Sequence, residues 1–221
     1  MKKVFLYLNI IIACATFVMN YVYMTEGGVL LKGICCIGFA LMGIVNLIYA
    51  AASKKKSIKF HAVMALGLVL AMTGDVVLGF DFIIGASLFA LGHVCYFIAQ
   101  CFFMKPRWMD AVISAVIFAC AGSFLMFFPK LNFDNDIMKY VCFVYALIIS
   151  VMVGKALSNV IAKPGLVTVV LAVGSVLFFF SDLMLVFDWF MDMSTGKLCM
   201  GTYIPAQCLL AFSSYLHEKI D

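Results

Sequence analysis

The segment LAMTGDVVLGFDF, residues 70–82, places a carboxylate, Asp75, inside an apolar run long enough to cross a lipid bilayer. A charged side chain at the bilayer centre costs about 2.5–3.5 kcal/mol on insertion scales, so such a residue indicates a functional site. A second segment, LFFFSDLMLVFDWF at residues 177–190, holds Asp182 in the same setting. Both aspartates begin the pattern D-x-x-L-x-F-D-aromatic. The recurrence predicts two equivalent helices, each with one acidic side chain of functional importance.

The composition is that of a membrane protein. Of the 221 residues, 66% are hydrophobic, against about 45–50% in soluble domains, and the mean hydropathy is +1.15. The net charge of +4 comes from basic residues in short loops rather than from a patch with interleaved aromatic residues. We therefore expect an integral membrane protein whose partner is the lipid bilayer, in the cell membrane, and we exclude nucleic-acid binding.

The cysteines favour neither a redox site nor a metal site. All of them fall inside apolar runs, without C-x-x-C spacing and without clustered histidines. We expect them to be small core residues. We expect no metal and no cofactor, because the chemistry of the sequence requires neither, and an all-carboxylate site for a divalent cation stays open as an alternative. The nine are Cys14, Cys35, Cys36, Cys95, Cys101, Cys120, Cys142, Cys199 and Cys208.

Apolar runs of about 18–23 residues recur along the chain, each the length of a membrane-spanning helix. Short connections with glycine, proline and charged residues separate them. The sequence predicts an all-α membrane fold in a single domain, residues 1–221, with eight spanning helices. Their expected ranges are 4–24, 29–50, 58–80, 82–104, 108–128, 137–157, 165–187 and 198–216.

The distribution of lysine and arginine predicts the orientation, because cytoplasmic loops carry an excess of both. One set of loops holds Lys2, Lys3, Lys54, Lys55, Lys56, Lys59, Lys105, Arg107, Lys155, Lys163 and Lys219. The other set holds Lys130, Lys139 and Lys197 beside Glu26, Asp81, Asp134, Asp136, Asp188 and Asp192. Both termini are therefore expected in the cytoplasm.

The twin aspartates belong to a longer internal repeat. An offset of 107 residues carries Asp75 to Asp182 and also matches Tyr96 with Tyr203, Gln100 with Gln207, and Lys32 with Lys139. The chain thus reads as a duplicated four-helix unit, with halves at about 1–107 and 108–221. Because four is an even number, both halves enter the membrane in the same direction, which makes the repeat parallel.

The repeat predicts a polar cluster in the outer half of the bundle. Each aspartate lies six residues before an outer-loop aspartate, or about 9 Å at 1.5 Å per residue. Lys32 and Lys139 fall at a similar or shallower depth, and His93 with Tyr96 lies somewhat deeper. Met200 stands at the position that matches His93. His93 therefore breaks the symmetry, as a site that distinguishes an acid from a base requires.

These segments resemble the successive signatures of the YhhN-like membrane proteins, the lysoplasmalogenase family. The matching stretches are GLVLAMTGDVVLGF (67–80), FALGHVCYFIAQ (89–100), VYALIISVMVGKAL (144–157), VGSVLFFFSDLMLVF (173–187) and GTYIPAQCLLAF (201–212). Lys32 matches the lysine usual in the family's second helix. The resemblance implies an eight-helix membrane enzyme that hydrolyses the vinyl ether bond of lysoplasmalogens to a fatty aldehyde and a glycerophospho-base. The segments between the motifs are generic apolar sequence, so they imply no substrate preference.

The chemistry of the aspartates agrees with that implication. A vinyl ether is cleaved by protonation of its β-carbon and capture of the oxocarbenium ion by water, which needs one carboxylic acid and one carboxylate. Two buried aspartates can supply both. The expected catalytic residues are Asp75, Asp182 and His93, and the expected contacts to the lysophospholipid substrate are Lys32, Tyr96, Tyr203 and Gln207.

Other roles stay open for the same residues. Asp75 and Asp182 could be a structural polar pair, Lys32 and Lys139 could extend to the membrane interface, and His93 could be a core residue. Tyr96, Tyr203, Gln100 and Gln207 could join helices by hydrogen bonds. The alternative function is a small parallel-repeat transporter that uses the aspartate pair for proton or cation coupling. Against transport, the sequence predicts no paired broken helices.

Overall fold

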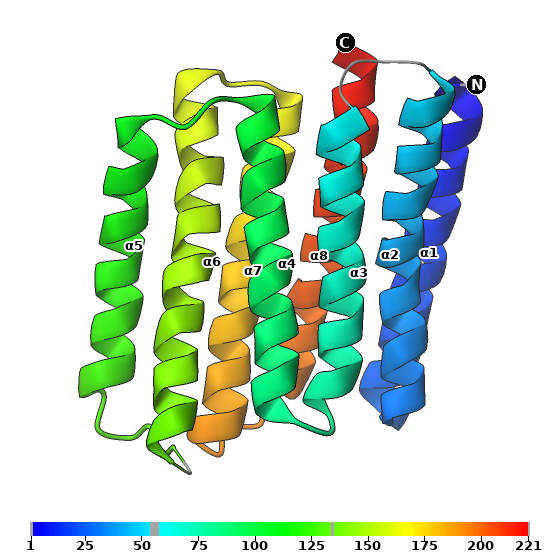
Figure 1. Ribbon diagram of the computed structural model, residues 1–221. Coiled ribbons are helices and arrows are strands. Elements are labelled where there is room, and N and C mark those ends of the chain that lie inside the picture. Colours follow the sequence, from blue (N-terminus) through cyan, green and yellow to red (C-terminus); the bar gives the residue numbers. More distant parts are fainter. Residues whose placement is uncertain (1, 54–57, 134, 221) are drawn as a thin grey trace.

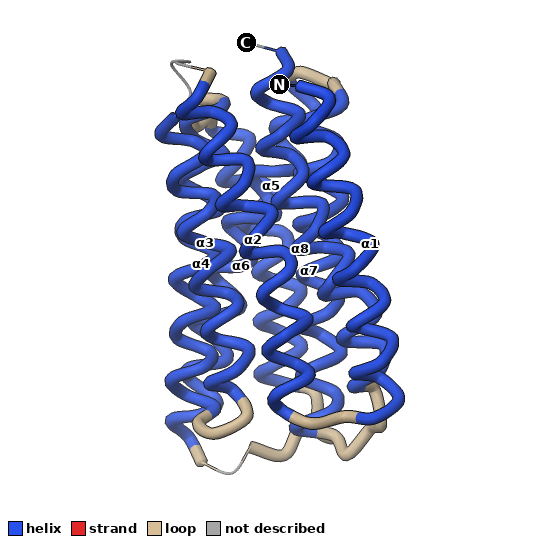
Figure 2. Tube along the Cα trace, turned by 90° about the vertical axis from the view of Figure 1, so that its right-hand side faces the viewer, coloured by secondary structure: helices blue, strands red, loops and turns tan. Residues whose placement is uncertain are grey.

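The computed structural model describes residues 2–53, 58–133 and 135–220, and only the backbone of 218–220. Within these residues the chain forms eight α-helices and no strand, and the helices alternate in direction (Figures 1 and 2). They are α1 (Lys2–Glu26), α2 (Val29–Ala52), α3 (Ile58–Leu78), α4 (Phe82–Phe103), α5 (Trp108–Phe127), α6 (Asp136–Ala162), α7 (Leu166–Phe190) and α8 (Gly196–Ile220). Lys54, Lys55, Lys56, Asp134 and the side chain of Lys219 lie outside the described residues.

Seven helices, α1 to α7, are long and apolar enough to cross a membrane, so this is a multi-pass membrane protein. Helix α8 is as long but more polar, because its position spares it contact with lipid. It packs against α1, α2, α3 and α7, and it buries Gln207, Ser213 and Ser214. An eighth membrane span therefore stays a prediction. Helix α8 is continuous through Pro205.

Helix α6 differs most from the prediction, because it ends at Ala162 rather than at Leu157. The next residues, Ser158 and Asn159, are polar and lie beyond the predicted helix, but both are fully buried inside the bundle. As a result Lys155, which was expected among the loop lysines, lies within α6 with 0% of its surface exposed. Tertiary contacts outweigh local polarity here.

The second aspartate of each repeated motif caps the N-terminus of the helix that follows. Oδ1 of Asp81 accepts a hydrogen bond of 2.9 Å from the backbone N–H of Ile84, which caps the N-terminus of α4. Oδ1 of Asp188 accepts bonds of 3.0 Å from the N–H groups of Thr195 and Gly196 at the start of α8. The recurring D-x-x-L-x-F-D pattern thus combines an aspartate inside a helix with a capping aspartate.

The helix contacts fit a four-helix repeat. Helix α3 packs on α4 as α7 packs on α8, and α2 packs on α8 as α6 packs on α4. The match is incomplete, since α1 packs against α8, whereas α5 has close contacts along its length only with α6 among the described helices. The duplication therefore stays a prediction from the sequence, and α5 is the least enclosed helix.

An ion-pair cluster fixes the start of α5 against α6. The Lys155 ammonium donates 2.8 Å to Oδ2 of Asp110 and 3.0 Å to the carbonyl of Lys105. The Arg107 guanidinium donates to the carbonyl and the hydroxyl of Ser158, at 2.6 and 2.9 Å. Nearby, a Cβ on Gly154 would lie 2.7 Å from the backbone nitrogen of Ser114, so only glycine permits this approach of α5 to α6. The two helices are therefore held together at this end.

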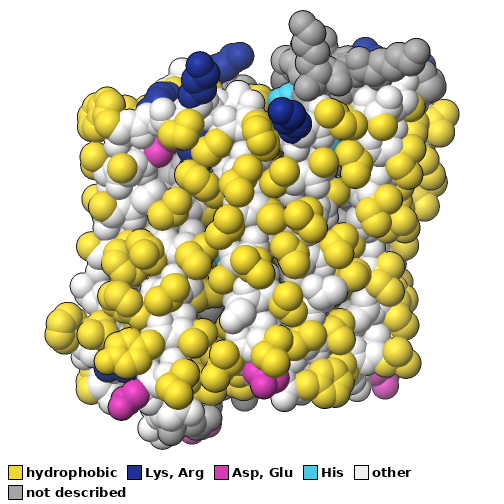
Figure 3. Space-filling model, viewed as in Figure 1, with side chains coloured by type: hydrophobic (Ala, Val, Ile, Leu, Met, Phe, Trp, Pro, Cys, Tyr) yellow, Lys and Arg dark blue, Asp and Glu magenta, His cyan; other side chains and the backbone are white. Residues whose placement is uncertain are grey.

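Both chain ends lie at the same end of the bundle, where α1 begins and α8 ends (Figure 1). Hydrophobic side chains cover the face seen in Figure 3, with lysine and arginine mostly at the end of the termini and acidic side chains mostly at the opposite end. This distribution agrees with the predicted orientation, which stays a prediction because no membrane is present. We call the end opposite the termini the outer end.

Candidate functional site

The two motif aspartates line one small cavity near the outer end, which we call the polar cavity. Its volume is about 160 Å³, and α1, α2, α3, α4, α7 and α8 contribute to its walls. The structure therefore brings Asp75 and Asp182 together, as the sequence predicts. The other polar or aromatic side chains of its lining are Tyr23, Lys32, Phe89, Ser181, Asp188, Trp189 and Tyr203.

Asp75 is held by α2. The Lys32 ammonium lies 2.9 Å from its Oδ1, and the thiol of Cys36, one helical turn further along α2, donates 2.8 Å to its Oδ2. Only 6% of the Asp75 side chain is exposed. Asp75 therefore lies in a buried ion pair with the Lys32 ammonium, which balances its negative charge.

Asp182 has different neighbours. The hydroxyl of Tyr145 on α6 donates a hydrogen bond of 2.6 Å to its Oδ2, and Nε2 of His93 on α4 lies 3.6 Å from the same oxygen. His93 Nε2 is also 2.7 Å from the Tyr145 oxygen. Since the single hydroxyl proton of Tyr145 is directed to Asp182, His93 is the donor in this second bond. The chain of donors runs from His93 through Tyr145 to Asp182.

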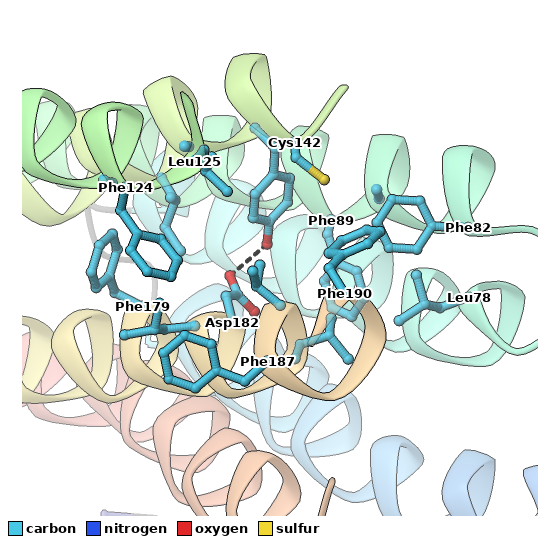
Figure 4. Close-up of a pocket in the computed structure, with 18 of the residues that line it drawn as sticks. Leu78, Phe82, Phe89, Phe124, Leu125, Cys142, Phe179, Asp182, Phe187 and Phe190 are labelled. Carbon is cyan, nitrogen blue, oxygen red and sulfur yellow. Dashed lines mark hydrogen bonds between the residues drawn. The ribbon is translucent and has the colours of Figure 1, made fainter. Parts of the chain in front are cut away.

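A larger apolar groove adjoins the polar cavity. It measures about 430 Å³ and lies between α4, α5, α6 and α7, with Leu78 of α3. Asp182 and Tyr145 are the residues that bring oxygen atoms into a lining otherwise made of hydrocarbon and thiol side chains. Figure 4 shows the Asp182 carboxylate among the labelled phenylalanines. Those that line the groove are Phe82, Phe89, Phe124, Phe179, Phe187 and Phe190.

Asp182 belongs to both cavities, together with Leu78, Phe89 and Leu185. Asp75 and Lys32 line only the polar cavity. The site therefore has a polar compartment with an ion pair, an apolar compartment, and one carboxyl group at the boundary. This arrangement suits an amphiphilic molecule whose polar and apolar parts meet at Asp182.

Several predicted site residues do not reach either cavity. Tyr96 donates a hydrogen bond of 2.8 Å to Oε1 of Gln207, and both side chains are fully buried between α4 and α8. Neither residue lines a cavity, and the same holds for Gln100 and for the half-buried Lys139. Of the four predicted substrate contacts, Lys32 and Tyr203 do line the polar cavity.

Sequence reasoning missed Tyr145 and Cys36. Tyr145 lies in the segment 144–157, which carries part of the family resemblance, and it is the first hydroxyl group in that apolar stretch. A hydroxyl in the middle of an otherwise apolar helix needs a buried partner, which was the available signal. Cys36 gave no comparable signal, because eight other cysteines occur in similar apolar runs.

The remaining titratable groups suggest no metal centre in the described part of the chain. The described residues contain no group of three or more His, Cys, Asp or Glu side chains arranged to hold a metal ion. All nine cysteines are free. Seven are buried or half-buried, and Cys14 on α1 and Cys120 on α5 are exposed.

Comparison with known proteins gives one match. Neither a curated protein nor a solved structure is similar enough to this chain to match it. The profile of the YhhN family matches residues 36–214, which include both aspartates, Tyr145 and His93. With most of its length matched, the chain belongs to the YhhN family.

Proposed function

We propose that this protein hydrolyses the vinyl ether bond of lysoplasmalogens, releasing a fatty aldehyde and a glycerophospho-base. One observation carries the proposal: the two aspartates of the repeated motif, Asp75 and Asp182, line one cavity, and Asp182, which has no lysine partner, stands at the boundary to an apolar groove. A lysoplasmalogen has its vinyl ether at the junction of its polar and apolar parts. The family resemblance supports the same activity.

The surroundings of the two aspartates suggest separate roles. Asp182 is the acid, because it adjoins the groove for the chain and has no lysine or arginine beside it within the described residues. Asp75 is the carboxylate, because Lys32 stabilises its charge. A pair of carboxyl groups in contrasting environments is the usual way to obtain an acid and a base in one site.

In this reaction Asp182 gives its proton to the vinyl carbon that does not bear oxygen. The positive charge is then shared by the other vinyl carbon and the ether oxygen, near the Asp75 carboxylate. Water adds to that carbon and loses a proton to Asp75, which gives a hemiacetal. Asp75 passes this proton to the glycerol oxygen as its bond to carbon breaks, and Asp182 recovers a proton from the hemiacetal hydroxyl. Both aspartates return to their starting states.

Tyr145 and His93 position the acid. Their contacts to Asp182 involve Oδ2, at 2.6 and 3.6 Å, so the other oxygen can carry the proton that is transferred. Asp188, Trp189 and Tyr23 also line the polar cavity and offer negative charge and aromatic faces to a cationic head group.

The test is aldehyde release by the purified protein. A lysoplasmalogen in detergent micelles or nanodiscs is incubated with the protein, and the aldehyde is measured by reduction with alcohol dehydrogenase and NADH. The wild-type protein should release aldehyde, whereas the same lysolipid with a saturated ether should give none, because it lacks the double bond that is protonated. Absence of aldehyde with choline and ethanolamine head groups alike would reject the proposal.

A further inference from the structure

The apolar groove is only partly closed on the side of α5. Helix α5 packs along its length against α6, and it meets α7 through one aromatic contact, Phe124 with Phe187, whose ring centroids are 5.8 Å apart. Both rings are half-buried and line the groove. Cys120, one turn before Phe124, lines the groove and is also exposed on the surface of α5. The groove therefore reaches the lipid-facing surface between α5 and α7.

We propose that this groove binds the hydrocarbon chain of a single-chain ether lipid, which enters sideways from the membrane between α5 and α7. The inference rests on the proposed function and adds where the chain lies and how it arrives. Its occupant follows from continuity with the polar cavity, because Asp182, Leu78, Phe89 and Leu185 line both spaces. A lipid with its head in the polar cavity has its chain in the groove.

The size of the groove selects one chain. A water molecule, which has one heavy atom, takes up roughly 30 Å³ in the liquid. If each heavy atom of a chain needs the same space, a groove of 430 Å³ holds on the order of 14 heavy atoms. That is most of one fatty chain and much less than the two chains of an intact phospholipid. We therefore expect a lysolipid to occupy the groove more tightly than a phospholipid with two chains.

The wall that moves in this proposal is α5. Its beginning is fixed to α6 by the Asp110–Lys155 pair and by the close approach at Gly154. Its outer half packs on α6 through Phe118 and Phe143, whose ring centroids are 5.0 Å apart, but among the described rings it meets α7 through Phe124 alone. A small outward movement of the outer half opens the groove without breaking the ion pair. Helix α5 also contributes no residue to the polar cavity, so its movement leaves the ion pair of Asp75 in place.

Chain length provides the first test. Ala121 is half-buried on α5 and lines the groove but not the polar cavity, so Ala121→Phe fills space on the α5 side of the groove, away from the bound head group. We expect KM for a 16-carbon lysoplasmalogen to rise about tenfold or more, and KM for an 8-carbon analogue to stay within about twofold. Ala115→Phe, on the exposed face of the same helix, is the matched control and should change neither. An equal change for both chain lengths would overturn the proposal.

Thiol labelling provides a test that does not depend on hydrolysis. Cys120 and Cys14 are both exposed on peripheral helices, but only Cys120 lines the groove. The wild-type protein in nanodiscs is treated with N-ethylmaleimide, with and without a saturated 16-carbon ether lysolipid, and each site is quantified by peptide mass spectrometry. The lysolipid should slow labelling of Cys120 at least about fivefold and leave Cys14 unchanged.

The two tests separate this inference from the proposed function. Protection of Cys120 in a protein that releases no aldehyde would keep the groove as a lysolipid site and reject the hydrolase. The opposite result would keep the hydrolase and reject the groove: the protein releases aldehyde, but Cys120 is labelled at the same rate with and without the saturated lysolipid, at a concentration that fully inhibits hydrolysis. A diacyl phospholipid that protects Cys120 as well as the lysolipid does would reject the selection of single chains.

Discussion

Tyr145 donates a hydrogen bond of 2.6 Å to Asp182, and the residue 107 positions earlier in the chain is Gly38, which can make no such bond to Asp75. A Cβ on Gly38 would lie 2.9 Å from the Cβ of Thr16, so this position serves the close packing of α2 against α1. The two aspartates recur in the sequence but stand in different surroundings. That difference is what an acid and a base require.

The first prediction concerns the aspartates themselves. Asp75→Asn and Asp182→Asn keep the shape of the side chain but remove proton transfer, a contribution typically of about 10²–10⁴-fold. Each variant should bind a saturated ether lysolipid and yet lose aldehyde release by this factor. The double variant should be little worse than either single one, because groups that act as a unit are not additive. The measurement is kcat by the coupled aldehyde assay.

The control for these variants is their thermal unfolding in detergent, which should show that they remain folded. Asp188→Asn serves as a comparison, because Asp188 caps α8 and lines the same cavity but has no part in the proton transfers. Wild-type turnover by either Asp75→Asn or Asp182→Asn would reject the mechanism, although the fold would stand.

Lys32 should act through Asp75. Its ammonium is 2.9 Å from the carboxylate and only 17% of its side chain is exposed, so Lys32→Met leaves a buried carboxylate without its counter-ion. We expect kcat to fall at least about tenfold, with KM changed less. If Lys32 instead holds the lipid phosphate, KM rises and kcat is retained. Steady-state kinetics over a range of lysolipid concentrations distinguishes the two outcomes.

Tyr145 and His93 should behave as one unit. Tyr145→Phe removes the donor to Asp182, and His93→Phe removes the donor to Tyr145, so each interrupts the same chain. Each single variant should lower kcat by about 10-fold or more, and the double variant should lower it by no more than the stronger single one. Additive losses in this double-mutant cycle would show that the two residues act independently of each other.

The sequence was sufficient for most of the fold. Long apolar runs predict the helices, and the glycine, proline and charged residues of the short connections predict their ends. It was insufficient where burial outweighs composition. Ser158 and Asn159 lie beyond the predicted helix but extend α6, and the polar residues of α8 suit a helix enclosed by four others rather than by lipid. The local sequence shows which residues are polar. Whether a polar side chain faces water or is buried against other helices depends on tertiary packing.

For the site, recurrence was the informative signal. Asp75 and Asp182 stand out because a carboxylate inside an apolar run is energetically costly, and the motif that contains it occurs twice. Lys32 was identified from the family resemblance. Tyr145 could not be identified in this way, since it has no counterpart in the first half of the chain. Tyr96 and Gln207 resemble site residues in sequence because a polar pair that joins two helices leaves the same signature as one that binds a substrate.

The buried ion pair at the start of α5 should govern stability. Lys155 is fully buried and lies 2.8 Å from Asp110, so Lys155→Met leaves the Asp110 carboxylate with only the more distant Arg107 guanidinium, at 3.7 Å, as a cationic partner. Removing one partner of a buried pair typically costs up to about 3–5 kcal/mol. The variant should unfold at a clearly lower temperature in detergent. Replacing both residues, Asp110→Leu with Lys155→Met, should recover much of the loss. No recovery in the double variant would indicate that Lys155 contributes through its contact to the Lys105 carbonyl instead.

Tyr96 and Gln207 should affect stability rather than substrate binding. Tyr96→Phe leaves the buried Oε1 of Gln207 without its donor, at a cost of about 1–3 kcal/mol, and should lower the unfolding temperature. Since neither residue lines a cavity, KM should stay within about twofold of the wild-type value. Combining Tyr96→Phe with Gln207→Leu removes both partners and should restore part of the stability.

Tyr203→Phe is the matched comparison, because Tyr203 lines the polar cavity and its hydroxyl is 3.3 Å from the carbonyl of Ala71. A larger change in KM for Tyr96→Phe than for Tyr203→Phe would mean that α4 and α8 separate when the lysolipid binds, and that the pair then contacts the substrate.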